Sequence, residues 1–257
     1  MKKIIFIFGT RPEAIKMAPV VNIFKKDVKN FDILVAITAQ HREMLDQVLD
    51  AFEIIPDYDL DLMSNNQALE NLTGKILIGI SGLLDKVNPD LIFVQGDTTT
   101  TFVSSLAAFY KKIQVCHIEA GLRTNNKYSP FPEEINRRIT SAIATYHFPP
   151  TKQSEQNLFD EGIERGKVIL TGNTVIDALL TVSKKVDSNI TTYDENFSNE
   201  YGINFDQQNT ILVTGHRRES FGKNFENICN AIKHIAKKNN VQFIYPVYMN
   251  PNVQESV

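Results

Sequence analysis

The stretch DLIFVQGDTTTTFVSSLAAFYKKIQVCHIEAGLRT (residues 90–124) decides the expected fold. It begins with the apolar run DLIFVQ (90–95) and contains a second apolar run, IQVCHI (113–118). Between these runs, residues 98–112 carry apolar side chains at three- and four-residue spacing, which is typical of a helix packed on one face. Two near-continuous apolar strands joined by a helix indicate a β-α-β unit in a parallel sheet that is covered on both faces.

The same alternation continues on both sides of this unit. Other apolar runs that predict strands occupy residues 3–8, 31–38, 167–172, 210–215 and 241–247. Helical spacing occupies residues 42–52, 69–87, 133–144 and 226–238. Repeated β-α-β order predicts an α/β fold with a doubly wound sheet.

The polar stretch at residues 187–209 interrupts this pattern, and we interpret it as a linker or surface loop. We expect a first domain at residues 1–171 and a second domain from residue 172 to residue 257.

The composition and the motifs that the sequence lacks argue against several classes of protein. A net charge of −3 over 257 residues argues against a nucleic-acid binder but allows a local basic pocket for a small anion. The cysteines Cys116 and Cys229 are interpreted as reduced core residues of a cytoplasmic protein, and no apolar run reaches membrane-spanning length. The sequence has neither a G-x-G-x-x-G motif nor histidines and cysteines at metal-ligand spacing, so we expect no dinucleotide cofactor and no metal.

The segment GTRPEAIK (9–16) follows the first predicted strand. Gly9 allows a tight turn, and Pro12 suits the first position of a helix. Arg11 and Lys16 add positive charge beside the free N–H groups of that helix start, which together suit a phosphate.

Other ionisable residues follow other predicted strands or begin a predicted helix; these are Asp97, Glu119, Arg123, Glu133, Glu134, Arg137, Arg138 and His216. Each alone has a structural explanation, since Asp97 could cap a helix and the two glutamates could complement a helix dipole. The arginines could form a solvated face. However, the carboxyl ends of parallel strands meet at one edge of a sheet, so these groups should converge. Carboxylates, a histidine and arginines together favour acid–base chemistry on an anionic substrate.

Six motifs, in order, resemble those of the non-hydrolysing UDP-N-acetylglucosamine 2-epimerases. They are FGTRPEAIKMAP, VQGDTTTTF, HIEAGLRT, SPFPEEINRR, TGNTVIDAL and VTGHRRESFG. The resemblance implies two Rossmann-like domains of glycosyltransferase-B type, the second incomplete in this chain. It also implies interconversion of UDP-N-acetylglucosamine and UDP-N-acetylmannosamine without a cofactor, by a cytoplasmic homodimer.

The resemblance further implies a set of site residues. The expected catalytic residues are Asp97, Glu119, Glu133 and His216. The expected substrate-binding residues are Arg11, Lys16, Arg137 and Arg138, together with Asp97, Glu119 and His216. The sequence does not decide which carboxylate removes the proton.

The chain departs from the family pattern at two places. Tyr248, in YPVYMNPNV (245–253), stands where the family has histidine, and a tyrosine hydroxyl carries no positive charge near neutral pH. The chain also ends at Val257, where family members continue.

Three hypotheses therefore remain: an active epimerase, an inactive truncated remnant that binds UDP-sugar weakly or not at all, and, ranked last, a glycosyltransferase of similar fold. Incubation with UDP-N-acetylglucosamine alone discriminates between them.

Overall fold

The structure consists of two units. It is a computed structural model that describes residues 1–38, 42–62, 67–214 and 223–246. The units are Met1–Ser183 and Lys184–Val257, so the division lies later in the chain than residue 171. Helix α7 (Val175–Asp187) crosses this division, and its Ala178 is buried in the core of the first unit.

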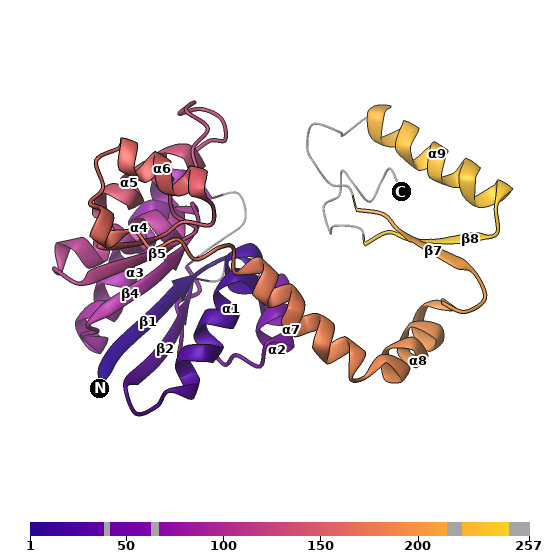
Figure 1. The fold of residues 1–257 in the computed structure, drawn as a ribbon, viewed down its shortest axis with the longest axis horizontal. Coiled ribbons are helices and arrows are strands. Elements are labelled where there is room, and N and C mark those ends of the chain that lie inside the picture. Colours follow the sequence, from indigo (N-terminus) through magenta and orange to yellow (C-terminus); the bar gives the residue numbers. More distant parts are fainter. Residues whose placement is uncertain (39–41, 63–66, 215–222, 247–257) are drawn as a thin grey trace. The chain divides into compact units, whose positions relative to one another are not determined.

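The first unit contains a six-stranded sheet in the order β3-β2-β1-β4-β5-β6 (Figure 1). Its strands are β1 (Lys2–Phe8), β2 (Phe31–Ile37), β3 (Tyr58–Asp59), β4 (Leu91–Gln95), β5 (Gln114–Ile118) and β6 (Tyr146–Phe148). All neighbouring strands are parallel. This is the strand order of a Rossmann fold, so the predicted doubly wound sheet is confirmed.

Helices cover both faces of this sheet. They are α1 (Arg11–Lys26), α2 (Arg42–Ala51), α3 (Leu69–Val87), α4 (Thr99–Tyr110), α5 (Glu133–Ile143) and α6 (Lys152–Asp160). Alternate residues of β1 enter separate cores, because side chains along a strand point to opposite faces. Phe6 packs with α1 and α2, whereas Ile5 and Ile7 pack with α3 and α4. The result is a three-layer α/β/α arrangement whose strand ends lie together at one edge.

Two sequence interpretations were wrong. Residues 167–172 do not form a strand: the chain makes a short 3-10 turn at Arg165–Lys167. An isolated bridge between Val168 and His147 follows, with Ile169 N donating to the His147 carbonyl oxygen. The stretch 187–209 is not a loop throughout, because helix α8 (Ile190–Tyr201) occupies its middle. None of the residues of α8 is buried, and all except the half-buried Tyr193 and Phe197 are exposed, which agrees with its polar composition.

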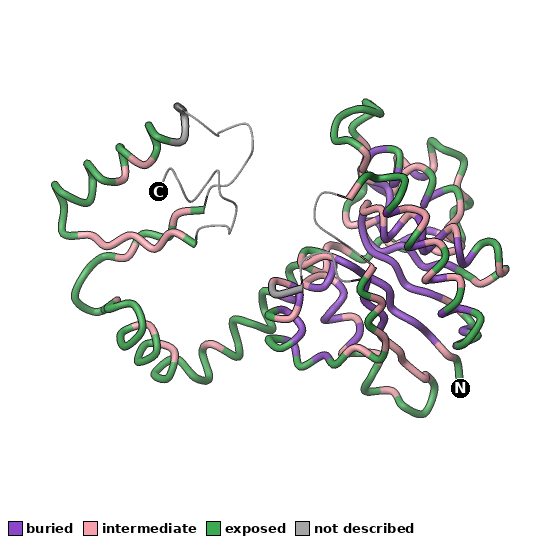
Figure 2. The backbone as a smooth tube through the Cα atoms, turned by 180° about the vertical axis from the view of Figure 1, so that it is seen from behind, coloured by how far each residue is buried: buried purple, intermediate pink, exposed green. Residues whose placement is uncertain are grey.

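The second unit contains the parallel strands β7 (Asn209–Leu212) and β8 (Val241–Ile244) and helix α9 (Lys223–Lys238), as predicted. None of the described residues from 184 onward is buried, whereas buried residues line the sheet of the first unit (Figure 2). No helix within the described ranges is long and apolar enough to cross a membrane.

Candidate functional site

Glu13 organises the loops after two strands. Its Oε2 accepts hydrogen bonds from the backbone N–H groups of Gly9 at 3.1 Å and Thr10 at 2.8 Å. Its Oε1 accepts from the hydroxyls of Thr98 at 2.8 Å and Thr101 at 3.1 Å. Burial raises the pKa of this carboxyl, although the four hydrogen bonds oppose that effect. Glu13 therefore ties the start of α1 to the start of α4.

The turn at Gly9 leaves no room for a side chain. A Cβ on Gly9 would lie 2.2 Å from Thr38 Oγ1 and 2.7 Å from Thr100 Oγ1. The helix that follows begins at Arg11, with Thr10 as its N-cap. The sequence predicts a helix start in this segment, but Pro12 occupies the second helical position rather than the first. Arg11 and Lys16 both lie on this helix, beyond the end of β1.

Glu119 lies directly after β5, and its side chain is 11% exposed. Lys16 Nζ donates to Glu119 Oε2 at 2.6 Å, and Gln95 Nε2 donates to the same oxygen at 2.5 Å. Asn173 Nδ2 donates to the other oxygen, Oε1, at 3.2 Å. The structure thus brings the predicted residues Lys16 and Glu119 into a direct ion pair.

Asp97 follows β4 and pairs with Arg137 of α5. Arg137 donates to Asp97 Oδ2 from Nε at 2.8 Å, and its Nη2 lies 2.6 Å from the same oxygen. The helix that follows is capped by Thr98, whose hydroxyl accepts from Thr101 N at 3.1 Å. The interpretation of Asp97 as a helix cap is therefore wrong, and its carboxylate faces a cation instead.

The turn at Gly96 brings the Asp97 and Glu119 segments together. Gly96 has φ +74°, and a Cβ placed on it would lie 3.7 Å from Glu119 Oε2. His117 Nε2 lies 2.7 Å from the Gly96 carbonyl oxygen, to which it donates. Burial lowers the pKa of His117 to about 3, so the imidazole is neutral at pH 7. A neutral, buried histidine thus holds the turn that precedes Asp97.

Glu134 anchors the predicted arginines. Its carboxylate is completely buried and accepts from the backbone N–H groups of Thr124 at 3.0 Å and Asn125 at 3.2 Å. It also pairs with Arg137 at 3.3 Å and Arg138 at 3.1 Å. Burial acts to raise the pKa of Glu134, but these donors outweigh it and the pKa is lowered.

Arg138 therefore contacts Glu134, together with Glu161 at 3.4 Å and Asn125 at 3.0 Å. The guanidinium group of Arg138 is therefore bound by other side chains of the protein.

One more predicted residue lies among the described residues. Glu133 is the first residue of α5, and its Oε2 is buried without a hydrogen-bond partner among the described residues. His216 and Tyr248 lie outside the described residues.

Sequence reasoning missed the roles of Glu13, Gln95, Glu134 and Asn173 in this network. Glu13 carried a readable local signal, since Thr10 and Glu13 have the spacing of a capping box, and Glu134 carried another in its i,i+3 and i,i+4 spacing to Arg137 and Arg138. The contacts of Gln95 and Asn173 with Glu119 join residues 24 and 54 positions apart. Glu134 bonds the backbone of Thr124 and Asn125 across 10 and 9 positions, although its pairs with Arg137 and Arg138 have helical spacing.

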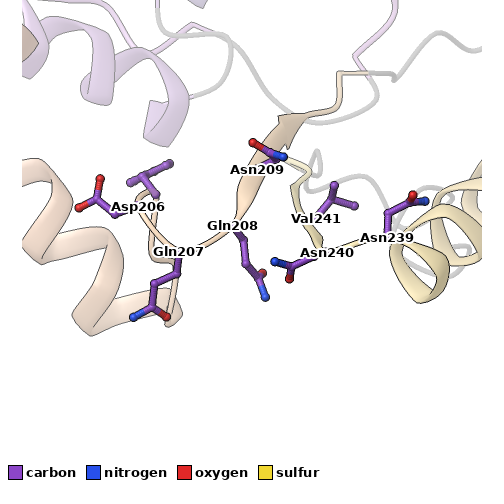
Figure 3. Close-up of a pocket in the computed structure, with 8 residues that line it drawn as sticks. Asp206, Gln207, Gln208, Asn209, Asn239, Asn240 and Val241 are labelled. Atoms are coloured by element: carbon purple, nitrogen blue, oxygen red, sulfur yellow. The ribbon is translucent and has the colours of Figure 1, made fainter.

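We also considered two other kinds of binding site, a metal site and the cavity of the second unit. Within the described ranges, no group of three or more His, Cys, Asp or Glu side chains could hold a metal ion. A cavity of about 390 Å³ lies in the second unit, lined by residues 205–209 and 239–241 (Figure 3). It lies at the amino ends of β7 and β8, whereas ligands of open α/β sheets bind beyond the carboxyl ends.

The edge of the first sheet therefore combines two carboxylates, each paired with a cation. Such an arrangement can exchange protons with a substrate and stabilise an anion beside it.

Comparison with known proteins identifies related chains. A family model described as UDP-N-acetylglucosamine 2-epimerase matches residues 25–257. UDP-N-acetylglucosamine 2-epimerase of Salmonella typhimurium is 53% identical over 256 residues, which cover 99% of this chain and 68% of that protein. The crystal structure of the UDP-GlcNAc 2-epimerase from Neisseria meningitidis bound to UDP-GlcNAc has a TM-score of 0.88 at 50% identity, covering 99% of this chain and 68% of the other.

A more distant likeness concerns the fold alone. The apo form of a lipopolysaccharide outer core galactosyltransferase has a TM-score of 0.50 at 13% identity and covers 95% of this chain and 60% of the other. Together with the epimerase structure, this likeness confirms the glycosyltransferase-B-type fold that the sequence predicted.

Proposed function

This chain belongs to the UDP-N-acetylglucosamine 2-epimerase family, and from that premise we propose that it interconverts UDP-N-acetylglucosamine and UDP-N-acetylmannosamine. The observation that carries the proposal is the pairing of Glu119 with Lys16 and of Asp97 with Arg137 at neighbouring strand ends. These groups supply the proton transfer and the anion stabilisation that inversion at a sugar carbon beside a diphosphate requires.

The chemistry explains why both kinds of group are needed. The C2 proton of the sugar is weakly acidic because no carbonyl is adjacent to it. A base can remove it when the C1–oxygen bond to UDP breaks, so that the C–H electrons form a C1–C2 double bond and UDP leaves with the bond electrons. UDP then adds back to C1 while a proton is delivered to the opposite face of C2.

We assign the proton transfers to Asp97, Glu119 and Glu133. Glu133 Oε2 has no hydrogen-bond partner among the described residues, so the acceptor capacity of this oxygen is not used by those residues. Arg11, Lys16, Arg137 and His216 would stabilise the departing diphosphate through charge-assisted hydrogen bonds. Arg138 would act mainly by holding Glu134 and the loop at Thr124 and Asn125.

The test is incubation of the chain with UDP-N-acetylglucosamine alone in D₂O, followed by proton NMR. We expect UDP-N-acetylmannosamine to appear and deuterium to enter at C2, because the C2 proton exchanges with solvent through the base. Absence of turnover together with absence of UDP binding by calorimetry would instead support an inactive remnant. Turnover that requires an added sugar acceptor would support a glycosyltransferase.

We also propose that the chain acts as a homodimer in the cytoplasm, with UDP-N-acetylmannosamine as its second ligand. Light scattering after size-exclusion chromatography tests the first part, and a monomeric mass would contradict it. Fractionation of the source cells tests the second part.

A further inference from the structure

We propose that Asn173 is a positioning residue that fixes the carboxylate plane of Glu119 for proton transfer. The inference rests on the proposed function, because it gives Asn173 a part in that reaction. It is carried by the contact between Asn173 Nδ2 and Glu119 Oε1 at 3.2 Å.

The two oxygens of Glu119 have different partners. Lys16 and Gln95 both donate to Oε2, at 2.6 Å and 2.5 Å. Among the described residues, Asn173 is the hydrogen-bond donor to Oε1. Because rotation about the last torsion of a glutamate is soft, two contacts on one oxygen leave the carboxylate plane free to turn. A third donor on the other oxygen fixes the plane.

The backbone of Glu119 is already fixed. Its φ is +64°, a left-handed conformation that is uncommon for a non-glycine residue. Its N–H donates to the Phe148 carbonyl oxygen at 3.0 Å, and the next N–H, of Ala120, donates to the same oxygen at 3.3 Å. With the backbone held, the orientation of the carboxylate is the remaining freedom, and Asn173 acts on that freedom.

The orientation of the Asn173 amide is fixed in turn. Its Oδ1 accepts from Val175 N at 3.1 Å, so its NH₂ group must face Glu119. The backbone of Thr174 accepts from Ala178 N at 3.0 Å, and Ala178 is buried in the core of the first unit. The amide is therefore held by the first turn of α7 and presents a donor to the carboxylate.

A competing explanation is that Asn173 only supports the start of α7, through its bond to Val175 N. The variant Asn173→Asp separates the two roles. Aspartate keeps an acceptor for Val175 N and is as favourable as asparagine at helix starts. It has no NH₂ donor, however, and it places a second negative charge beside Glu119.

For Asn173→Asp we expect kcat to fall about 10- to 100-fold, the effect of losing one hydrogen bond to a charged group, with a smaller change in KM. The acidic limb of the pH profile of kcat should move to higher pH, because the added carboxylate disfavours a second negative charge beside it. Asn173→Ala should also lower kcat but leave that limb closer to its wild-type position.

Asn189→Asp is the matched control, since Asn189 is an exposed asparagine at the N-cap of α8. We expect wild-type kcat and an unchanged pH profile for it. Wild-type kcat and an unchanged profile in Asn173→Asp would overturn the positioning role and leave the proposed function standing.

Wild-type protein without turnover would overturn the proposed function. In that case an NMR comparison, which needs no turnover, tests whether Asn173 donates to Glu119. The Asn173 side-chain amide protons should shift in Glu119→Gln if they bond the carboxylate, and unchanged signals would overturn the inference.

Discussion

Glu13 and Glu119 lie near the same strand ends, but their hydrogen-bond partners give the two carboxylates different roles. Glu13 is 2% exposed, and it accepts hydrogen bonds from backbone N–H groups and threonine hydroxyls. Glu119 keeps 11% of its side chain exposed and faces the Lys16 ammonium group. A buried carboxylate held by neutral donors ties loops together, whereas a partly exposed one beside a cation can reach a substrate.

Removal of Glu119 or of Asp97, two of the three proposed proton-transfer groups, should abolish most turnover. We expect Glu119→Gln and Asp97→Asn each to lower kcat by about 100-fold or more, since a positioned acid or base contributes about that factor. Steady-state kinetics with UDP-N-acetylglucosamine measure this effect. Urea unfolding of the same variants should show small changes, and Glu164→Gln, at an exposed position, serves as the control. Near-normal kcat in either variant would remove that residue from the mechanism.

His117 should make the fold sensitive to acid. Burial lowers the pKa of His117 to about 3, whereas the pKa of an unfolded histidine lies near its ordinary value of 6.5. The contribution of His117 to the free energy of unfolding is therefore fully present above about pH 6.5. It falls as the pH drops, because His117 binds a proton in the unfolded chain but not in the folded chain. Between pH 7 and pH 5 this amounts to about 2 kcal/mol. The nearby charges of His147 and Arg123 also lower the pKa of His117. Burial lowers the pKa of His147 to about 4, so His147 should add to the same loss of stability in acid.

The variant His117→Gln tests this linkage. Glutamine places an amide nitrogen close to the Nε2 position and can still donate to Gly96, but it does not titrate. We expect urea unfolding to show a smaller loss of stability between pH 7 and pH 5 in the variant than in wild type. An equal loss in both proteins would exclude His117 as the source.

At the scale of elements, the turn after β5 is fixed by close contact with α6. Gly121 has φ +84°, and a Cβ on it would lie 2.1 Å from the Ser154 carbonyl oxygen. Asn157 Nδ2 donates to the Gly121 carbonyl oxygen at 2.8 Å, so α6 holds this turn from both sides. The turn follows Glu119 directly, and its geometry therefore sets where that side chain emerges.

Gly121→Ala should destabilise the fold by more than backbone strain alone. Gly162 has the same φ of +84°, but a Cβ added to it would meet nothing within 4 Å, so Gly162→Ala is a matched control. We expect Gly162→Ala to lower the free energy of unfolding by about 1–2 kcal/mol, from left-handed strain. Gly121→Ala should lower it further, because a backbone carbonyl has to move. Similar values for both variants in urea unfolding would show that the contact with Ser154 relaxes easily.

At the scale of the whole molecule, the two units differ in how much they bury. The first unit has a core on each face of its sheet and a smaller third cluster around Leu158. The second unit has apolar residues on its strands and helix that remain exposed, including Leu212 at 65% and Ile235 at 44%. The small two-stranded sheet of this unit removes little apolar surface from water, and burial of such surface is the main source of folding free energy.

Hydrogen exchange should therefore differ between the units. We expect backbone amides of β7 and β8 to exchange much faster than those of β1 and β4, because local opening exposes little additional apolar surface in the second unit. Mass spectrometry of peptides from both units measures this difference. Equal protection in the two sheets would show that the second unit is stabilised by contacts beyond those described.

The sequence by itself determined the alternation of strands and helices, because periodicity and apolar runs report local burial directly. It predicted β1, β2, β4 and β5, the helices between them, and the carboxylates and cations that follow the strands. It failed at residues 167–172 and at α8, since an apolar run does not guarantee a strand partner and a polar segment can still form an exposed helix.

Only the tertiary structure decided which of these groups meet. The pairs Lys16–Glu119, Arg137–Asp97 and Asn173–Glu119 join residues separated by 103, 40 and 54 positions. The order of strands in the sheet creates those neighbours, and burial of Glu13, His117 and Glu134 then fixes the turns that carry them. A local pattern contains no information on such partners, because the free energy that selects them comes from packing distant segments together.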